Sequence, residues 1–171
     1  MIRFFGGRVM TLANGIETQD IEVWTEGSKI VFVGKPKAEE LDGKVFEREY
    51  DLKGNLLMPS FKNAHTHSAM TFLRSYADDM PLQDWLFKQI FPMEAKLDGE
   101  KVYWLTKLAI LEYLTTGCTA AFDMYFELDD YVKACTESGF RSVLCGAVSG
   151  DKSNLCLLYT SDAADDSLRV D

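Results

Sequence analysis

Short alternations of hydrophobic and polar residues mark the first third of the chain. Residues 21–25 and 29–33 are rich in β-branched and aromatic side chains and are separated by a glycine-containing turn, so they predict a hairpin. Alternation over 45–52 predicts another strand, and Asn14-Gly15 predicts a turn because both residues tolerate positive φ. We therefore expect residues 1–55 to form a small antiparallel sheet.

At residue 56 the pattern changes to longer apolar runs. Residues 56–61 form a continuous apolar run that is typical of a strand buried on both faces, with Pro59 near its end. Residues 118–122 and 142–148 have the same character and predict two further strands. Asp123 follows the strand predicted over 118–122, and we expect it to orient a loop.

Three helices are predicted after the first apolar run. A short helix is expected over 81–90, and a third helix over 128–138. The second helix is expected between Asp98, a good N-cap, and Gly117, a good C-terminal stop. Its apolar stripe at helical spacing consists of Trp104, Leu105, Leu108 and Leu111. The alternation of strands and helices indicates the beginning of a parallel α/β arrangement.

Residues 155–171 lack the helical period, the strand alternation and the cap signals of the preceding chain. The segment 156–166 resembles the translation of a transposon-end adapter used in sequencing libraries. We therefore interpret 155–171 as a non-native tail that takes no part in the fold. The alternative is a native acidic terminus, since acidic tails are common.

Composition and charge exclude several classes of protein. A chain of 171 residues that is 47% hydrophobic is not disordered and can bury a sizeable core. The formal net charge of -9 argues against nucleic acid or an anionic membrane surface as a partner. No stretch approaches the roughly 18 apolar residues of a membrane span.

The four cysteines contain no Cys-x-x-Cys pair, so a cysteine-rich zinc site is not expected. Free thiols in a reducing cytosol are the better interpretation, and we expect a cytoplasmic protein.

His65 and His67 are the only two histidines in the chain. On an extended strand, residues two apart point to the same side with Cβ atoms about 6–7 Å apart. Two such imidazoles can both reach one metal ion at about 2.0–2.1 Å. The pair directly follows the apolar strand that opens the α/β series, and the carboxyl ends of strands carry the active site in such folds. The sequence thus predicts a metal site at His65 and His67.

A simpler alternative is two polar residues in a loop, because His-x-His is a common tripeptide. A catalytic zinc site normally has three protein ligands and an open position, and no third histidine is present. Either carboxylates or cysteines complete the site, or the missing ligands lie beyond this chain. The second option agrees with the interpretation of the tail.

The segment around the two histidines, residues 57–70, resembles the signature opening of the amidohydrolase superfamily. Within this superfamily, the chain resembles the 5'-methylthioadenosine/S-adenosylhomocysteine deaminases most specifically in residues 73–86, 91–94 and 122–126. The likeness covers residues 1 to about 154.

This resemblance implies an α/β fold, the amino-terminal part of a (β/α)8 barrel of TIM type preceded by half of a small β-sandwich. Residues 1–55 would supply the half sandwich, and residues 56–154 the first strands and helices of the barrel. A complete barrel needs about 250 residues, so the chain is expected to be truncated.

The resemblance also implies zinc-dependent hydrolytic deamination of an adenine nucleoside, a small-molecule partner. His65 and His67 would bind one Zn²⁺, or another divalent metal, together with a histidine and an aspartate from later strands. Glu94 would accept hydrogen bonds from the two ribose hydroxyls. The glutamate that shuttles protons also lies on a later strand, so no catalytic residue is expected in this fragment, which would be inactive by itself. For the full-length form, assembly into a homo-oligomer remains an open alternative.

Two alternatives remain from the sequence. Another amidohydrolase, of guanine deaminase or triazine hydrolase type, would keep His65 and His67 and abandon the ribose role of Glu94. This alternative stays open because the chain departs from the resembled family at Cys145. Many relatives carry an arginine there that contacts the substrate. The other alternative is a non-catalytic metal-binding or interaction fragment, in which Glu94 would be a solvated acid at a helix end.

Overall fold

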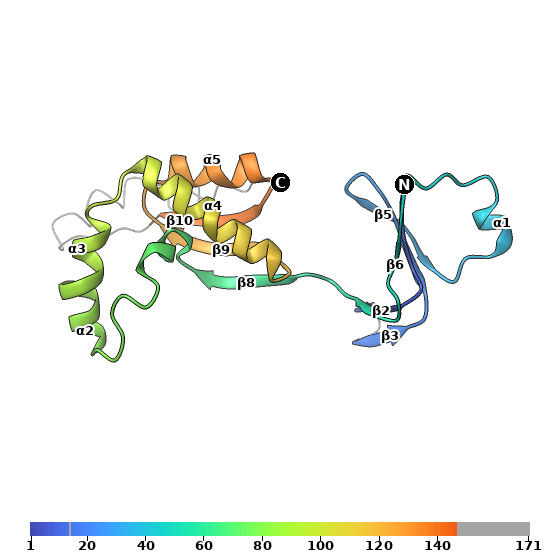
Figure 1. Ribbon diagram of the computed structural model, residues 1–171, viewed down its shortest axis with the longest axis horizontal. Helices are drawn as coiled ribbons and strands as arrows, with labels where there is room; N and C mark the ends of the chain where they lie inside the picture. Colours follow the sequence, from blue (N-terminus) through green and yellow to red (C-terminus); the bar gives the residue numbers. More distant parts are fainter. Residues whose placement is uncertain (14, 147–171) are drawn as a thin grey trace. The chain divides into compact units, whose positions relative to one another are not determined.

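The computed structural model describes residues 1–13 and 15–146 and divides into two compact units, with the division between Pro59 and Ser60 (Figure 1). Asn14, the end of the strand predicted over 142–148 and the tail predicted at 155–171 lie outside the described residues.

The described residues of the first unit form two sheets and one short helix. Its elements are β1 (Ile2–Phe5), β2 (Arg8–Thr11), β3 (Glu17–Gln19), β4 (Glu22–Glu26), β5 (Lys29–Gly34), α1 (Ala38–Leu41), β6 (Arg48–Asp51) and β7 (Leu56–Leu57). One sheet has the strand order β5-β4-β1-β6 and the other the order β3-β2-β7. The predicted hairpin is confirmed as the antiparallel pair β4 and β5. The prediction of an antiparallel sheet is wrong in part, because β6 pairs in parallel with β1 and β7 pairs in parallel with β2.

Trp24 is the centre of the core of the first unit and is 3% exposed. Its ring stacks on Phe32 with ring centroids 4.1 Å apart, and Phe46 packs edge-on against it. The indole Nε1–H donates to Glu22 at 2.9 Å, so the one polar atom of this buried ring is satisfied.

The strand predicted over 56–61 is two separate strands. Leu56–Leu57 forms β7 and pairs with β2 in the first unit, whereas β8 (Phe61–Thr66) belongs to the second unit. Pro59 lies between them and has no N–H to donate to a sheet. The strand that leads to the histidines therefore begins at Phe61.

The second unit is a parallel α/β layer (Figure 1). Its elements are β8, the 3₁₀ helix η1 (Ser68–Leu73), α2 (Leu82–Asp84), the π-helix η2 (Trp85–Ile90), α3 (Phe91–Glu94), α4 (Gly99–Thr115), β9 (Cys118–Tyr125), α5 (Leu128–Ser138) and β10 (Arg141–Gly146). The strand order is β10-β9-β8, and both pairs are parallel. Helices α4 and α5 cover one face of this sheet, and a continuous hydrophobic core fills the space between. The predicted parallel arrangement is confirmed.

The predicted ends of α4 are confirmed. The Asp98 carboxylate accepts the backbone N–H of Lys101 at 3.0 Å, and Gly117 adopts φ +82° after the helix. The predicted apolar stripe is wrong, because Trp104, Leu108 and Leu111 are exposed. The buried face consists of Val102, Thr106, Ala109 and Ile110. Apolar residues of α4 occur on all sides of the helix, so their spacing along the sequence does not identify the buried face.

The sheet face opposite the helices is apolar and exposed. Phe122, Met124 and Val143 are between 37% and 47% exposed, and they alternate along β9 and β10 with residues buried beneath the helices. Within residues 1–13 and 15–146, no helix has both the length and the apolar character needed to cross a membrane.

Candidate functional site

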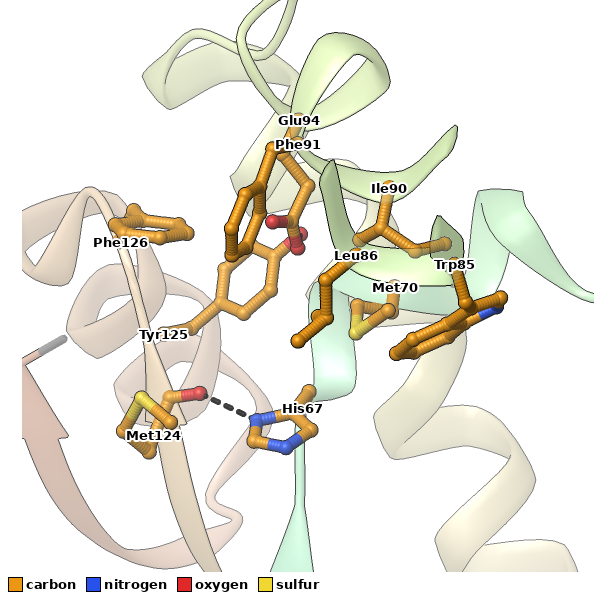
Figure 2. Close-up of a pocket in the computed structure, with 10 residues that line it drawn as sticks. All are labelled: His67, Met70, Trp85, Leu86, Ile90, Phe91, Glu94, Met124, Tyr125 and Phe126. Carbon is orange, nitrogen blue, oxygen red and sulfur yellow. Dashed lines mark hydrogen bonds between the residues drawn. The ribbon is translucent and has the colours of Figure 1, made fainter. Parts of the chain in front are cut away.

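The two histidines lie next to each other at the carboxyl end of β8. Their ring centroids are 5.0 Å apart, and the ring planes are inclined by 83°. Nδ1 of His67 lies 2.8 Å from the backbone carbonyl oxygen of Met124 near the end of β9 (Figure 2). An N–H at Nδ1 that donates to this carbonyl leaves the lone pair of Nε2 free for a metal ion. The donor set at this strand end therefore fits two ligands of a metal site.

An irregularity in β8 lies directly beside the histidines. Asn63 pairs with Ala121 and Thr66 pairs with Asp123, so β8 contains one more residue than β9 over this stretch. Such bulges redirect side chains and are frequent next to active sites. The sequence pattern gave no sign of this bulge, because it depends on the register with a strand that lies 50 or more residues away.

No third ligand accompanies the pair in the part of the chain that the structure describes. Among residues 1–13 and 15–146, no group of three histidine, cysteine, aspartate or glutamate side chains could bind a metal ion. Cys118 and Cys135 are buried free thiols and Cys145 is a half-buried one. The described carboxylates and cysteines thus do not complete a metal site.

A cavity of about 270 Å³ lies at the same end of the sheet. Its lining is His67, Met70, Trp85, Leu86, Ile90, Phe91, Glu94, Met124, Tyr125 and Phe126 (Figure 2). The lining is mostly apolar and aromatic. Its titratable groups are the imidazole of His67, the carboxyl of Glu94 and the hydroxyl of Tyr125. His67 and Glu94, which the sequence analysis singled out, therefore face one cavity. His65 is exposed and does not line it.

The helix predicted over 81–90 continues to Glu94 and changes type on the way. Trp85–Ile90 form a π-helical segment between the short helices α2 and α3. This segment supplies Trp85, Leu86 and Ile90 to the wall of the cavity. π-Helical segments are rare and are frequently found at functional sites.

Glu94 is half-buried, and its Oε1 accepts a hydrogen bond from the hydroxyl of Tyr125 at 3.0 Å. Burial raises the pKa of the Glu94 carboxyl above its ordinary value, and the bond from Tyr125 opposes this change. Sequence reasoning missed Tyr125. Its only signal is a hydroxyl-bearing ring at the carboxyl end of a strand, which does not identify the partner.

Asp123 occupies a different place from the one predicted. Strand β9 continues to Tyr125, so Asp123 lies inside the sheet and is completely buried on the side of the helices. Burial raises the pKa of its carboxyl, while hydrogen bonds from Ser68 and Tyr131 lower it. The bond from the Ser68 backbone N–H orients the segment that follows His67, in agreement with the predicted loop-orienting role.

A parallel α/β unit with a histidine pair at the end of its first strand is the arrangement typical of the amidohydrolases. The model of the Amidohydrolase family matches residues 56–165, and the chain belongs to this family. The resemblance noted in the sequence is therefore confirmed.

Several relatives within the family carry the names of adenosine-type deaminases. A 5-methylthioadenosine/S-adenosylhomocysteine deaminase of Desulfitobacterium hafniense (strain DSM 10664 / DCB-2) is 42% identical over 133 residues, covering 78% of this chain and 31% of the relative. A 5'-deoxyadenosine deaminase of Methanoregula boonei is 53% identical over 95 residues, covering 56% and 22%. The crystal structure of an adenosine deaminase from Xanthomonas campestris with bound zinc superposes with a TM-score of 0.77 at 33% identity, covering 83% of this chain and 33% of that one. The chain spans a third or less of the length of these relatives.

Proposed function

We propose that this chain is the amino-terminal part of a zinc-dependent amidohydrolase that removes the amine from the adenine ring of a nucleoside. The observation that carries the proposal is the common cavity of His67 and Glu94 at the carboxyl end of a parallel sheet. A nucleoside of the 5'-methylthioadenosine or S-adenosylhomocysteine type is the proposed substrate, since relatives named for such substrates share 42–53% of the aligned residues.

The second unit would supply the first strands of a (β/α)8 barrel, and the first unit half of a β-sandwich. The exposed apolar face of the sheet supports the barrel. Phe122, Met124 and Val143 are 47%, 37% and 45% exposed, and such side chains fill the interior of a closed barrel. Strands β8 and β10 are the edges of the described sheet, where further barrel strands would pair.

His65 and His67 would bind the zinc ion, together with ligands from strands that this chain does not contain. When bound, zinc lowers the pKa of a coordinated water to about 7 and thereby supplies a nucleophile for hydrolysis at neutral pH. The contact of His67 with the Met124 carbonyl would keep the imidazole in the tautomer that presents Nε2. We expect no turnover from the 171-residue chain alone, because two histidines are fewer than the three protein ligands of a catalytic zinc site.

Glu94 would bind the ribose. A carboxylate can accept both sugar hydroxyls in charge-assisted hydrogen bonds. Tyr125 donates to Oε1 alone, so Oε2 and the remaining acceptor capacity of Oε1 are available to a ligand. The aromatic and aliphatic side chains of the cavity, among them Trp85 and Phe91, suit a purine ring and an apolar substituent on the sugar.

The test uses the full-length enzyme that begins with this chain and measures ammonia release and bound zinc. His65→Ala is expected to lose both the zinc and the turnover of 5'-methylthioadenosine. Glu94→Ala is expected to weaken the use of the nucleoside far more than that of free adenine.

Equal losses for nucleoside and free base would exclude the ribose role and favour an amidohydrolase of the guanine or triazine type. Wild-type zinc content in both His65→Ala and His67→Ala would overturn the metal assignment. A full-length protein without zinc or turnover would favour a non-catalytic interaction role.

A further inference from the structure

Asp123 is a buried carboxylate whose hydrogen bonds lead directly to the histidine pair. Its side chain is 0% exposed and accepts the backbone N–H of Ser68 at 3.1 Å and the hydroxyl of Tyr131 at 2.5 Å. Within residues 1–13 and 15–146 it forms no ion pair. A buried charge without a cation normally lowers stability, so these two hydrogen bonds are what keeps the ionised form tolerable.

Hydroxyl groups from both covering helices contact the residues on either side of His67. Thr66 hydrogen-bonds with the hydroxyl of Tyr113 on α4 at 2.5 Å, and the Ser68 hydroxyl lies 2.9 Å from the same oxygen. The Ser68 hydroxyl also lies 3.3 Å from that of Tyr131 on α5. The backbone before and after His67 is therefore attached to the helix layer.

The backbone at His67 has little regular structure of its own. It lies between the bulge in β8 and the 3₁₀ helix η1, with φ −133° and ψ 77°. Regular sheet pairing ends at Thr66, so the side-chain bonds to Ser68 and Thr66 determine where the backbone of His67 lies. A metal ligand displaced by about 0.5 Å already departs from productive geometry.

We propose that Asp123 is a positioning residue for the histidine pair, acting through the Ser68 backbone with Tyr131 as the donor that stabilises its carboxylate. This inference rests on the proposed metal role of His65 and His67. Asp123 contacts neither the imidazole rings of the two histidines nor the cavity. It fixes the position of the His67 backbone, from which the imidazole extends. Groups that hydrogen-bond directly to a metal ligand contribute about 10–100-fold to metal affinity, and Asp123, which acts through the Ser68 backbone, is expected at the lower end of this range.

The test titrates the full 171-residue chain with Zn²⁺ and follows the ¹⁵N signals of the imidazoles, which are simple to assign because the chain has two histidines. Asp123→Asn is expected to weaken Zn²⁺ binding by about tenfold and to shift the His67 signals in the metal-free chain. Tyr131→Phe is expected to give a smaller loss in the same direction, and it carries the test if Asp123→Asn does not fold.

Ser142→Ala is the matched control, because Ser142 is a buried hydroxyl that lies 3.4 Å from that of Tyr131 and does not contact the histidine segment. It is expected to leave the Zn²⁺ affinity and the His67 signals unchanged. Folded Asp123→Asn and Tyr131→Phe chains with wild-type affinity and wild-type imidazole signals would overturn the positioning role. If His65→Ala and His67→Ala also keep wild-type affinity, the proposed metal site itself fails, and the two failures are thereby distinguished.

Discussion

The hydroxyl of Tyr125 donates to Oε1 of Glu94 at 3.0 Å and thereby joins the end of β9 to the end of α3. Burial, and after it the charge of Glu94, raises the pKa of the Tyr125 phenol, so the hydroxyl remains a donor at neutral pH. Burial also raises the pKa of Glu94, and the bond from Tyr125 acts against that increase. Tyr125 thus stabilises the ionised form of a carboxylate that burial destabilises.

Tyr125→Phe removes this donor and keeps the ring. We expect a further rise in the pKa of Glu94 and, in the full-length enzyme, a rise in nucleoside KM of about tenfold, equivalent to about 1.4 kcal/mol. The increase should be larger at pH 5.5 than at pH 7, because more of the carboxyl is then protonated, and kcat should change less than KM. Tyr76→Phe, at an exposed tyrosine, is the control. An unchanged KM at both pH values would contradict the role of Tyr125.

The ion pairs of Arg3 should make the stability of the first unit depend on pH. Its guanidinium makes two bonds to Glu22, at 2.6 and 2.7 Å, and one to Glu49 at 2.9 Å. The bond from Arg3 is the main cause that lowers the pKa of Glu22 below its ordinary value of 4.5. A lowered pKa in the folded state means that the stabilisation is complete above pH 4.5 and is lost as the pH falls through the folded value.

Thermal unfolding of the chain between pH 7 and pH 3 measures this effect. The wild-type Tm should fall with acidification, and Glu22→Gln should have a lower Tm at pH 7 and a flatter dependence on pH. Glu49→Gln should change the profile less, because Glu49 is 47% exposed and makes one bond. Identical slopes for wild type and Glu22→Gln would show that this ion pair does not determine acid stability.

The described cysteines should differ in reactivity. Burial raises the pKa of the Cys135 thiol to about 11, so very little of it is ionised at pH 8. Cys118 is also buried, whereas Cys145 is half-buried. Alkylation of the native chain at pH 8, followed by peptide mass spectrometry, should label Cys145 well before Cys118 and Cys135. Equal labelling in denaturant is the control, and labelling of Cys135 first under native conditions would contradict the described packing.

The N-cap of α4 allows a direct test of local stability. Asp98→Ala removes the acceptor for the Lys101 N–H and should lower the free energy of unfolding. Glu100→Ala, in the same first turn, should have a smaller effect because Glu100 is not the cap. Denaturant unfolding of both variants gives the comparison, and equal losses would mean that the cap contributes nothing beyond the charge at the helix start.

Local signals account for the features that sequence analysis predicted well. Helix α5 has the predicted bounds, and α4 begins after Asp98 and ends before Gly117, because caps and left-handed glycines act within one turn. The histidine pair was also visible, since residues two positions apart are close in any fold. Each of these features depends on a few consecutive residues.

The features that were missed depend on tertiary contacts. The apolar run over 56–61 carries no sign that Leu56–Leu57 pairs with β2 whereas Phe61–Thr66 pairs with β9. The buried face of α4 depends on which of its apolar sides the sheet covers. The cavity joins His67 to Glu94 across 27 positions of sequence, and from the sequence only the family resemblance connected the two.

The extra residue of β8 between Asn63 and Thr66 makes the length of this segment as important as its composition. Deletion of Ala64 would remove the extra residue between Asn63 and Thr66, so the side chains on one side of the deletion would have to change faces of the sheet. The loss of this single codon would move the imidazoles away from the hydrogen bonds that attach Thr66 and Ser68 to the helix layer and to Asp123. The mutant sequence would still contain both histidines. Searches for inactive variants of this protein should therefore examine in-frame deletions as closely as substitutions of the ligands.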